Sequence, residues 1–274
     1  DERNFALLEP GVSYLDLYHY IREHGLKVWI DCADPGWGSP VGNALDHGIG
    51  YTMPHFRDHF GSHVGMEVVL ANGEVMRTGM GALPNADSWQ DYQYGYGPSP
   101  NGLFAQGNFG IVTKMGFRLM PQPEHYRNGV VTVPKRRDLI QLVRSVNYLS
   151  DSSLMGMATY GSPLFALMRN KDFRDTVTKR GGPSDAEMDK YASDNHLHSW
   201  QVLIEMYGPE RTTLANWEYA KQKIASEIPG AAFMDGESYK VPLTEEQLNA
   251  VTPYHNFHVQ ASQGVASLGI WNEM

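Results

Sequence analysis

The sequence predicts an α+β protein made of two successive parts, and three observations support this. Asn72-Gly73 lies between two β-branched runs, which is a strong signal of an antiparallel hairpin. The later half contains two strand–helix units whose lengths suit antiparallel strands, with the helices on one face of a sheet. Pro121 and Pro123 close a strand and mark the best candidate boundary between the two parts.

Composition and charge narrow the class of protein. The 274 residues are 42% hydrophobic and 19% charged, as in a soluble globular protein of one large or two ordinary domains. The net charge of −9 argues against a nucleic-acid surface and against docking on an anionic membrane. The single Cys32 excludes an intramolecular disulfide and a cysteine-based metal cage. No apolar run approaches the ~20 residues that span a bilayer.

The first part begins with a short strand over residues 5–8. Ser13 and Asp16 then predict a capped helix start, and Gly25 predicts the helix end. A strand over residues 26–32 follows, then the hairpin, a long irregular segment at 80–102, and a strand at 111–120. The buried helix face has a spacing of i, i+3, i+4 and i+7 and consists of Tyr14, Leu17, Tyr18 and Ile21.

The second part is predicted to contain three strands and two helices. The expected strands cover residues 129–133, 202–207 and 231–234, and the expected helices cover 135–149 and 210–228. Residues 169–199 are polar and are predicted to be loop and helix. The buried face of the second helix is expected to consist of Leu214, Trp217, Ile224 and Ile228.

Residues 31–52 are the most unusual stretch of the chain. They contain five glycines and two prolines, so no regular helix or strand can run through their whole length. No Lys or Arg occurs there before Arg57, so a phosphate bound at this stretch must be held by backbone N–H groups. The alternative is a long surface turn.

Four histidines follow in close succession, at His47, His55, His59 and His63. The last three have a zinc-like i, i+4, i+8 spacing, but Pro54 and Gly61 break the helix that such a site requires. The pattern therefore favours a surface or interdomain histidine cluster over a metal site.

Two further groups of residues leave alternatives open. Asp31 and Asp34 are either paired general acid and base groups or, for Asp34, the cap of an Asx-type turn. Tyr92, Tyr94 and Tyr96 share one face of an extended segment, for which simple packing is the plainer interpretation. No Gly-x-Ser-x-Gly elbow supports a serine hydrolase.

Five segments taken together resemble the vanillyl-alcohol oxidase, p-cresol methylhydroxylase and eugenol oxidase group of FAD-linked oxidoreductases. They begin with Asp-Cys-Ala-Asp-Pro-Gly-Trp-Gly-Ser at 31–39 and continue at 42–52, 65–74, 77–84 and 104–116. The resemblance implies that residues 1–123 are the second subdomain of a p-cresol methylhydroxylase-type FAD-binding domain that lacks its N-terminal part. Residues 124–274 would be an α+β substrate cap domain that lacks its C-terminal part, so we expect an internal fragment.

The resemblance also implies the site. Asp34 matches the acidic residue beside flavin N5, and Ile49 matches a position that shapes the substrate cavity. His47 departs from the Arg that is more frequent in the family, and the 53–63 segment is about two residues longer than usual. The implied FAD-binding residues are Ser39, Gly42, Asn43, Gly48, Gly50, Tyr51, Asn108, Gly110, Ile111 and Val112.

The implied activity is oxidation of 4-hydroxybenzylic alcohols or 4-alkylphenols in aromatic compound catabolism, by hydride transfer to flavin N5 through a quinone methide. The implied electron acceptor is O2 or a c-type cytochrome, the assembly a homo-oligomer, and any covalent flavin attachment lies outside this chain. The location would be cytoplasmic for an oxidase and periplasmic for a cytochrome-linked enzyme. The alternatives are a FAD-dependent 2-hydroxy-acid dehydrogenase of the same fold and a non-catalytic flavin-binding relative.

Overall fold

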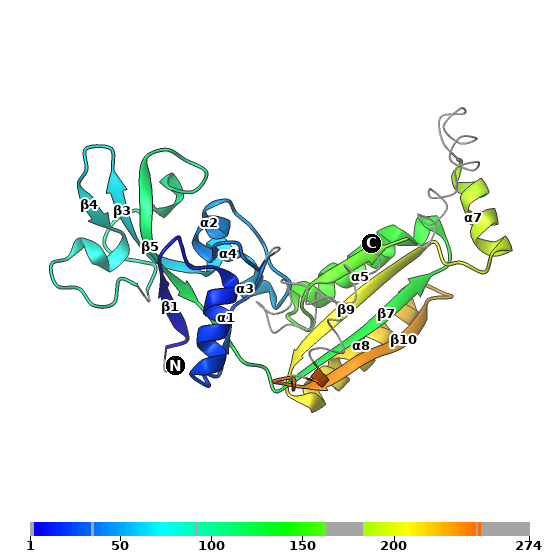
Figure 1. The fold of residues 1–274 in the computed structure, drawn as a ribbon. Coiled ribbons are helices and arrows are strands. Elements are labelled where there is room, and N and C mark those ends of the chain that lie inside the picture. The colour runs from blue at the N-terminus through cyan, green and yellow to red at the C-terminus, as the bar shows by residue number, and fades with distance from the viewer. Residues whose placement is uncertain (1–2, 34–35, 91, 163–182, 245, 248–274) are drawn as a thin grey trace. The chain divides into compact units, whose positions relative to one another are not determined.

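The computed structural model describes residues 3–33, 36–90, 92–162, 183–244 and 246–247 (Figure 1). The chain divides into two units, which meet in sequence between Gln122 and Pro123. Of the described residues after β10, those from Val241 to Thr244 group with the first unit rather than the second. The assignment of the units to a flavin domain and a cap domain stays a prediction.

The first unit is built on an antiparallel sheet in the order β1-β5-β3-β4. Gly73 has φ +83° in the turn between β3 and β4, so the hairpin predicted from Asn72-Gly73 is confirmed. The strand predicted over residues 26–32 is much shorter, because only two residues pair with another strand. The strands are β1 (Phe5–Leu8), β2 (Val28–Trp29), β3 (His63–Leu70), β4 (Val75–Arg77), β5 (Gly110–Arg118) and β6 (Met120–Pro121).

The helices of the first unit are short except for α1. Ser13 and Asp16 form the predicted capping box at the start of α1, and Gly25 follows its end with φ +60°. The helices are α1 (Tyr14–Glu23), α2 (Pro40–Leu45), α3 (Pro54–Arg57) and α4 (His59–Ser62), with 3-10 turns η1 (Gly79–Ala82) and η2 (Asn101–Leu103).

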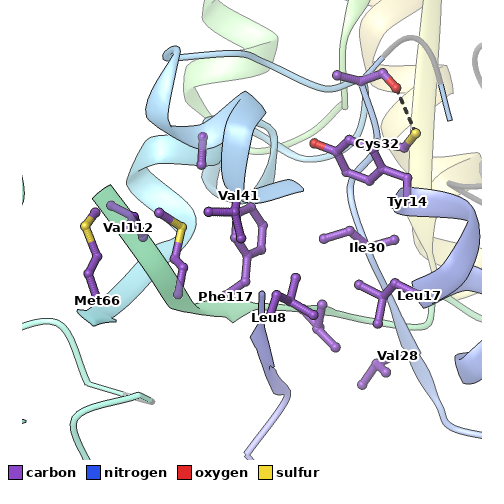
Figure 2. Packing of buried hydrophobic residues seen from close by; sticks show 14 of the residues in the cluster. Leu8, Tyr14, Leu17, Val28, Ile30, Cys32, Val41, Met66, Val112 and Phe117 are labelled. Atoms are coloured by element: carbon purple, nitrogen blue, oxygen red, sulfur yellow. Dashed lines mark hydrogen bonds between the residues drawn. The ribbon is translucent and has the colours of Figure 1, made fainter. Parts of the chain in front are cut away.

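The core of this unit lies between α1, α2 and one face of the sheet. Figure 2 shows Ile30 between Leu17 of α1 and Phe117 of β5. Val41 of α2 and Met66 of β3 belong to the same buried cluster. The chain that leads into the glycine-rich stretch is therefore fixed by apolar burial.

Two strand glycines let the long irregular segment lie against the sheet. A Cβ at Gly65 of β3 would come within 1.7 Å of the Trp89 carbonyl oxygen, and one at Gly116 of β5 within 1.8 Å of the Gln90 carbonyl oxygen. The Arg77 guanidinium lies 4.9 Å from the centre of the Trp89 ring. Only glycines allow the backbone of this segment to approach the sheet so closely.

The second unit is an antiparallel sheet in the order β10-β7-β9-β8, with α5 and α8 on one side of it (Figure 1). This arrangement confirms the predicted α+β class. A 3-10 turn, η3 (Arg136–Asp138), precedes α5, so this helix begins later than predicted. The elements are β7 (His125–Val133), α5 (Leu139–Asp151), β8 (Ala158–Gly161), α7 (Asp185–Asp194), β9 (Trp200–Gly208), α8 (Glu210–Glu227) and β10 (Ala232–Lys240).

One predicted contact of α8 is wrong. Leu214 is 44% exposed, whereas Thr213 is buried in its place. Trp217 sets the rotation of the helix, because its ring packs so closely on Gly129 of β7 that a Cβ there would lie 2.4 Å from it. Ala220 and Ile224 then follow Trp217 on the buried face.

Gly116→Ala should lower the free energy of unfolding by about 1–3 kcal/mol, since the new methyl group overlaps the Gln90 backbone. Gly102→Ala is the matched control, because no atom lies within 4 Å of a Cβ built there. Chemical denaturation of both variants measures the difference. Equal stability of the two variants would contradict the close approach described for Gly116.

Candidate cofactor site

An open groove of about 410 Å³ lies between α2 and the start of β5. Its walls are mainly apolar, and a backbone-rich rim is contributed by the glycines. Four residues predicted to bind FAD line it, namely Gly42, Gly110, Ile111 and Val112. The other lining residues are Pro10, Val41, Leu45, Asp46, Phe104, Gln106 and Gly107.

One edge of β5 has no neighbouring strand where it borders this groove. β1 pairs with β5 only from Met115 to Arg118, while β3 pairs with the other edge as far as Gly110. Within the described residues, the edge from Gly110 to Lys114 opposite β3 is therefore unpaired by any strand. Backbone N–H and C=O groups on such an edge can bond to the polar edge of a flat heteroaromatic ring.

The predicted residues around the groove act in different ways. Ser39 caps α2, because its hydroxyl accepts a hydrogen bond of 3.2 Å from the Gly42 N–H. Ile111 is 72% exposed, so its side chain is available to a ligand, whereas the Val112 side chain is buried in the core. Asn108 is exposed in the turn before β5.

The turn from Gly48 to Thr52 is held from within the protein. The Gly48 N–H donates to the Asn43 carbonyl (2.9 Å), and the Gly50 N–H donates to the Arg57 carbonyl (2.9 Å). The Tyr51 N–H donates to Asp31 Oδ1 at 3.2 Å. These three amides are thus engaged and offer no free donor to a phosphate. Contact of Asn43, Gly48, Gly50 or Tyr51 with FAD stays a prediction.

Asp31 and His59 form the centre of a buried polar network under this turn. Asp31 Oδ1 lies 2.9 Å from His59 Nε2, and both side chains are almost completely buried. Asp31 Oδ2 accepts hydrogen bonds from the Thr52 N–H at 2.7 Å and from the Thr52 hydroxyl. Charge-assisted hydrogen bonds of this kind are among the stronger ones in proteins.

The other face of His59 contacts residues of α1 and α2. His59 Nδ1 lies against Asn43 Oδ1 and 3.2 Å from the Tyr14 hydroxyl, which also donates to Asn43 Oδ1 at 3.3 Å. Burial, followed by the charges of Cys32 and Asp31, raises the pKa of Tyr14 well above its usual value. The Tyr14 hydroxyl therefore keeps its proton and remains a donor.

Two glycines make room for this network. A Cβ at Gly50 would lie 1.2 Å from Asp31 Oδ1, and a Cβ at Gly48 would lie 2.1 Å from Asn43 Nδ2. Neither glycine has a positive φ, so close approach is the reason for glycine at both positions. The sequence offered Asp31 only as an acid–base partner of Asp34 and His59 only as one member of a histidine cluster, so the contact between the two residues was not predicted. The Gly-x-Gly spacing at 48–50 was the only available signal that something approaches closely.

The histidines were predicted to form a surface or interdomain cluster, and a surface position is wrong for two of them. His55 in α3 is exposed, but His59 in α4 and His63 at the start of β3 are 0% and 1% exposed. The three lie in different elements, so the helical spacing is not realised. No group of three or more potential metal ligands occurs in the part of the chain that the structure describes.

His63 belongs to a separate polar contact. Asn101 Nδ2 donates to His63 Nε2 (2.7 Å) and to the Val64 carbonyl (3.2 Å), while His63 Nδ1 contacts the Phe60 carbonyl. The Nε2 atom thus accepts and Nδ1 donates, which is a neutral imidazole. Burial lowers the pKa of His63, against the opposing effects of the Phe60 carbonyl and the Asp58 charge.

The remaining predicted residues are placed as follows. Asp34, the predicted catalytic residue, lies outside the described residues. Ile49, predicted to shape the substrate cavity, is 57% exposed. The three tyrosines are not buried, since the exposed fractions of Tyr92, Tyr94 and Tyr96 are 52%, 58% and 87%. The rings of Tyr92 and Tyr94 do pack edge to face, with centroids 5.8 Å apart.

Comparison with known proteins first defines the class. Residues 1–79 match a family profile described as an FAD binding domain. This match identifies the fold of an FAD-binding flavoprotein. Among the described residues, no helix has both the length and the apolar character to cross a membrane.

Relatives over nearly the whole chain then define the family. The chain is 32% identical over 281 residues to the 4-cresol dehydrogenase (hydroxylating) flavoprotein subunit of Pseudomonas putida, covering 99% of this chain and 51% of that protein. The structure of p-cresol methylhydroxylase with substrate bound matches with a TM-score of 0.71 at 31% identity, over 99% of this chain and 51% of that chain. An isoeugenol complex of 4-ethylphenol oxidase from Gulosibacter chungangensis matches with 0.70 at 32% identity, over 97% and 50%.

The chain is therefore a homologue of the p-cresol methylhydroxylase-type, FAD-binding proteins. The chain spans about half the length of these relatives.

His63 should make stability depend on pH. Its pKa is lowered in the folded state, so the unfolded state takes up a proton first, at about pH 6.5. Stability is then fully present above pH 6.5 and falls as pH drops toward the folded pKa, by at most about 1.4 kcal/mol per pH unit. Urea denaturation between pH 7.5 and 5.5 should show this slope, and His63→Gln should make it shallower.

His55→Gln is the matched control for that measurement, because the His55 ring is exposed. This variant should keep the pH dependence of the unsubstituted protein. Part of the slope should survive in His63→Gln, because burial also lowers the pKa of His125. A slope equal to that of the unsubstituted protein would show that His63 does not contribute.

Proposed function

We propose that the complete protein containing this chain is an FAD-dependent oxidoreductase that oxidises 4-hydroxybenzylic alcohols or 4-alkylphenols. The proposal rests on one observation: this chain is 31–32% identical to its relatives over almost its whole length, including the second unit. Those relatives are named for 4-cresol, p-cresol and 4-ethylphenol. Similarity confined to the first unit would support the cofactor but not the substrate class.

The residues present fit FAD. The groove of about 410 Å³ falls within the range of about 300–1,000 Å³ typical of ligand sites and suits one ring system of FAD rather than the whole molecule. The apolar side chains of Val41, Leu45 and Phe104 line it. The open edge at Gly110–Lys114 supplies backbone groups for the polar edge of such a ring.

The protein side chains have distinct proposed tasks. Ser39 fixes the start of α2 and so the position of Gly42 at the groove, and Ile111 covers the ring with its exposed side chain. Ile49 limits the width of the substrate cavity. Asp34 accepts a proton from the substrate alcohol or activates a water molecule as general base.

Bound FAD supplies the hydride acceptor, at N5, for the benzylic carbon of the phenol. Loss of hydride converts the phenolate to a quinone methide, which then loses a proton or adds water. The electron acceptor would be O2 or a c-type cytochrome, and we expect the complete protein to be a homo-oligomer.

Two alternatives remain to be excluded by experiment. A FAD-dependent 2-hydroxy-acid dehydrogenase of the same fold would bind the same cofactor but would be reduced by a hydroxy acid. A non-catalytic flavin-binding relative would be reduced by neither substrate. The reducing substrate therefore distinguishes all three.

The protein purified with its natural flanking sequence should be yellow and should show the visible absorption of flavin. Under anaerobic conditions, 4-hydroxybenzyl alcohol should bleach this absorption, whereas lactate should not. A colourless protein would exclude the proposed cofactor. Bleaching by lactate alone would establish the hydroxy-acid alternative.

Asp34→Asn should slow anaerobic flavin reduction by 4-hydroxybenzyl alcohol by about 10²–10⁴-fold, because a general base is lost. The flavin content should stay unchanged, since Asp34 is not proposed to hold FAD. Stopped-flow absorbance measures the rate, and Asp87→Asn, in an exposed segment, is the control. A reduction rate equal to that of the control would remove Asp34 from the mechanism.

A further inference from the structure

We infer that Asp31 and His59 are positioning residues that together set the backbone of the Gly48–Thr52 turn in the FAD site. This inference rests on the proposed function, because the turn matters for activity only if FAD and a phenol bind beside it. Neither side chain is exposed, so neither residue can touch a ligand itself. Both act through the turn that they hold.

Asp31 holds the C-terminal half of the turn. Its two carboxylate oxygens accept from the N–H groups of two consecutive residues, Tyr51 at 3.2 Å and Thr52 at 2.7 Å. The Thr52 hydroxyl adds a third bond to the same carboxylate. Consecutive amides directed at one fixed anion leave this part of the backbone little rotational freedom.

His59 holds both ends of the Gly48–Thr52 turn. Its side chain orients Asp31 through the 2.9 Å contact at Nε2, while its backbone N–H donates to the Gly48 carbonyl at 3.3 Å. On its other side, His59 Nδ1 meets Asn43 Oδ1, and the Asn43 carbonyl accepts from the Gly48 N–H. One imidazole thus links the beginning and the end of the turn.

Ile49 lies between the two held ends. Its backbone forms a bridge with Asp58, while its side chain is 57% exposed. Gly48 and Gly50 on either side have no room for a Cβ. The direction of the Ile49 side chain, which is proposed to limit the substrate cavity, is therefore decided by the Asp31–His59 pair.

His63 provides an internal comparison. Like His59 it is buried, hydrogen-bonded and in the same segment of the chain. Its side chain contacts Phe60 and Asn101, and within the described residues no hydrogen bond joins it to the 48–52 turn. A purely structural role for His59 predicts the same consequences as loss of His63, whereas a positioning role predicts a local effect on the turn.

The test compares Asp31→Asn, His59→Gln and His63→Gln in the complete protein. Hydrogen exchange, followed by mass spectrometry without added FAD, measures the amides of Tyr51 and Thr52. We expect these amides to exchange at least tenfold faster in the first two variants, while the β3 amides stay protected. His63→Gln should leave the exchange rate at 51–52 unchanged.

The second readout is the flavin itself. The Asp31→Asn and His59→Gln variants should retain less FAD through gel filtration and should show a shifted visible flavin band and an altered KM for 4-hydroxybenzyl alcohol. His63→Gln should keep the spectrum and the KM, whatever its stability. If all three variants behave alike in both readouts, the inference is overturned.

Two further outcomes, a protein that binds no FAD and variants that do not fold, still allow the inference to be tested. If the unsubstituted protein binds no FAD, the proposed function fails, and the exchange measurement alone decides whether the pair holds the turn. If the Asp31 and His59 variants do not fold, Thr52→Val serves instead, since it removes only one bond to Asp31 at nearly constant volume. It should speed exchange at residues 51–52, and unchanged exchange would overturn the inference.

Discussion

The buried carboxylate of Asp31 is the interaction on which the candidate site depends. A carboxylate with almost no solvent contact is costly unless every lone pair finds a donor. Here Tyr51, Thr52 and His59 provide those donors. The Asp31 carboxylate and the backbone of the Gly48–Thr52 turn therefore stabilise one another. The Gly48–Thr52 turn is thereby held from within the protein.

Glycine serves the same purpose at two separate places in the first unit. Gly50 admits the Asp31–His59 pair, and Gly65 with Gly116 admits the backbone of Trp89 and Gln90. In each case atoms of another segment lie closer to the glycine than a Cβ at that position would allow. A family in which glycines are expected to cradle a cofactor thus also uses them to pack one segment of protein against another.

The two units contribute different parts of the functional argument. In the first unit, the groove beside the edge of β5 is the proposed place for FAD, because it offers apolar walls and backbone groups. The second unit contributes the sheet with α5 and α8, and the similarity that continues through it is the basis for proposing phenolic substrates. Asp34 links the proposed cofactor to the proposed substrate, because it is the only side chain proposed to exchange a proton with the substrate.

Local patterns in the sequence determined much of this protein. The capping box at Ser13, the hairpin at Gly73 and the helix periodicity of α1 were predictable, because each depends on residues a few positions apart. The family was equally readable from five short segments. Only the tertiary structure decided which buried groups meet: Asp31 and His59 lie 28 residues apart, and nothing local specifies such a pair. The exposure of Leu214 and the burial of His63 were decided in the same way, by how elements distant in sequence pack together.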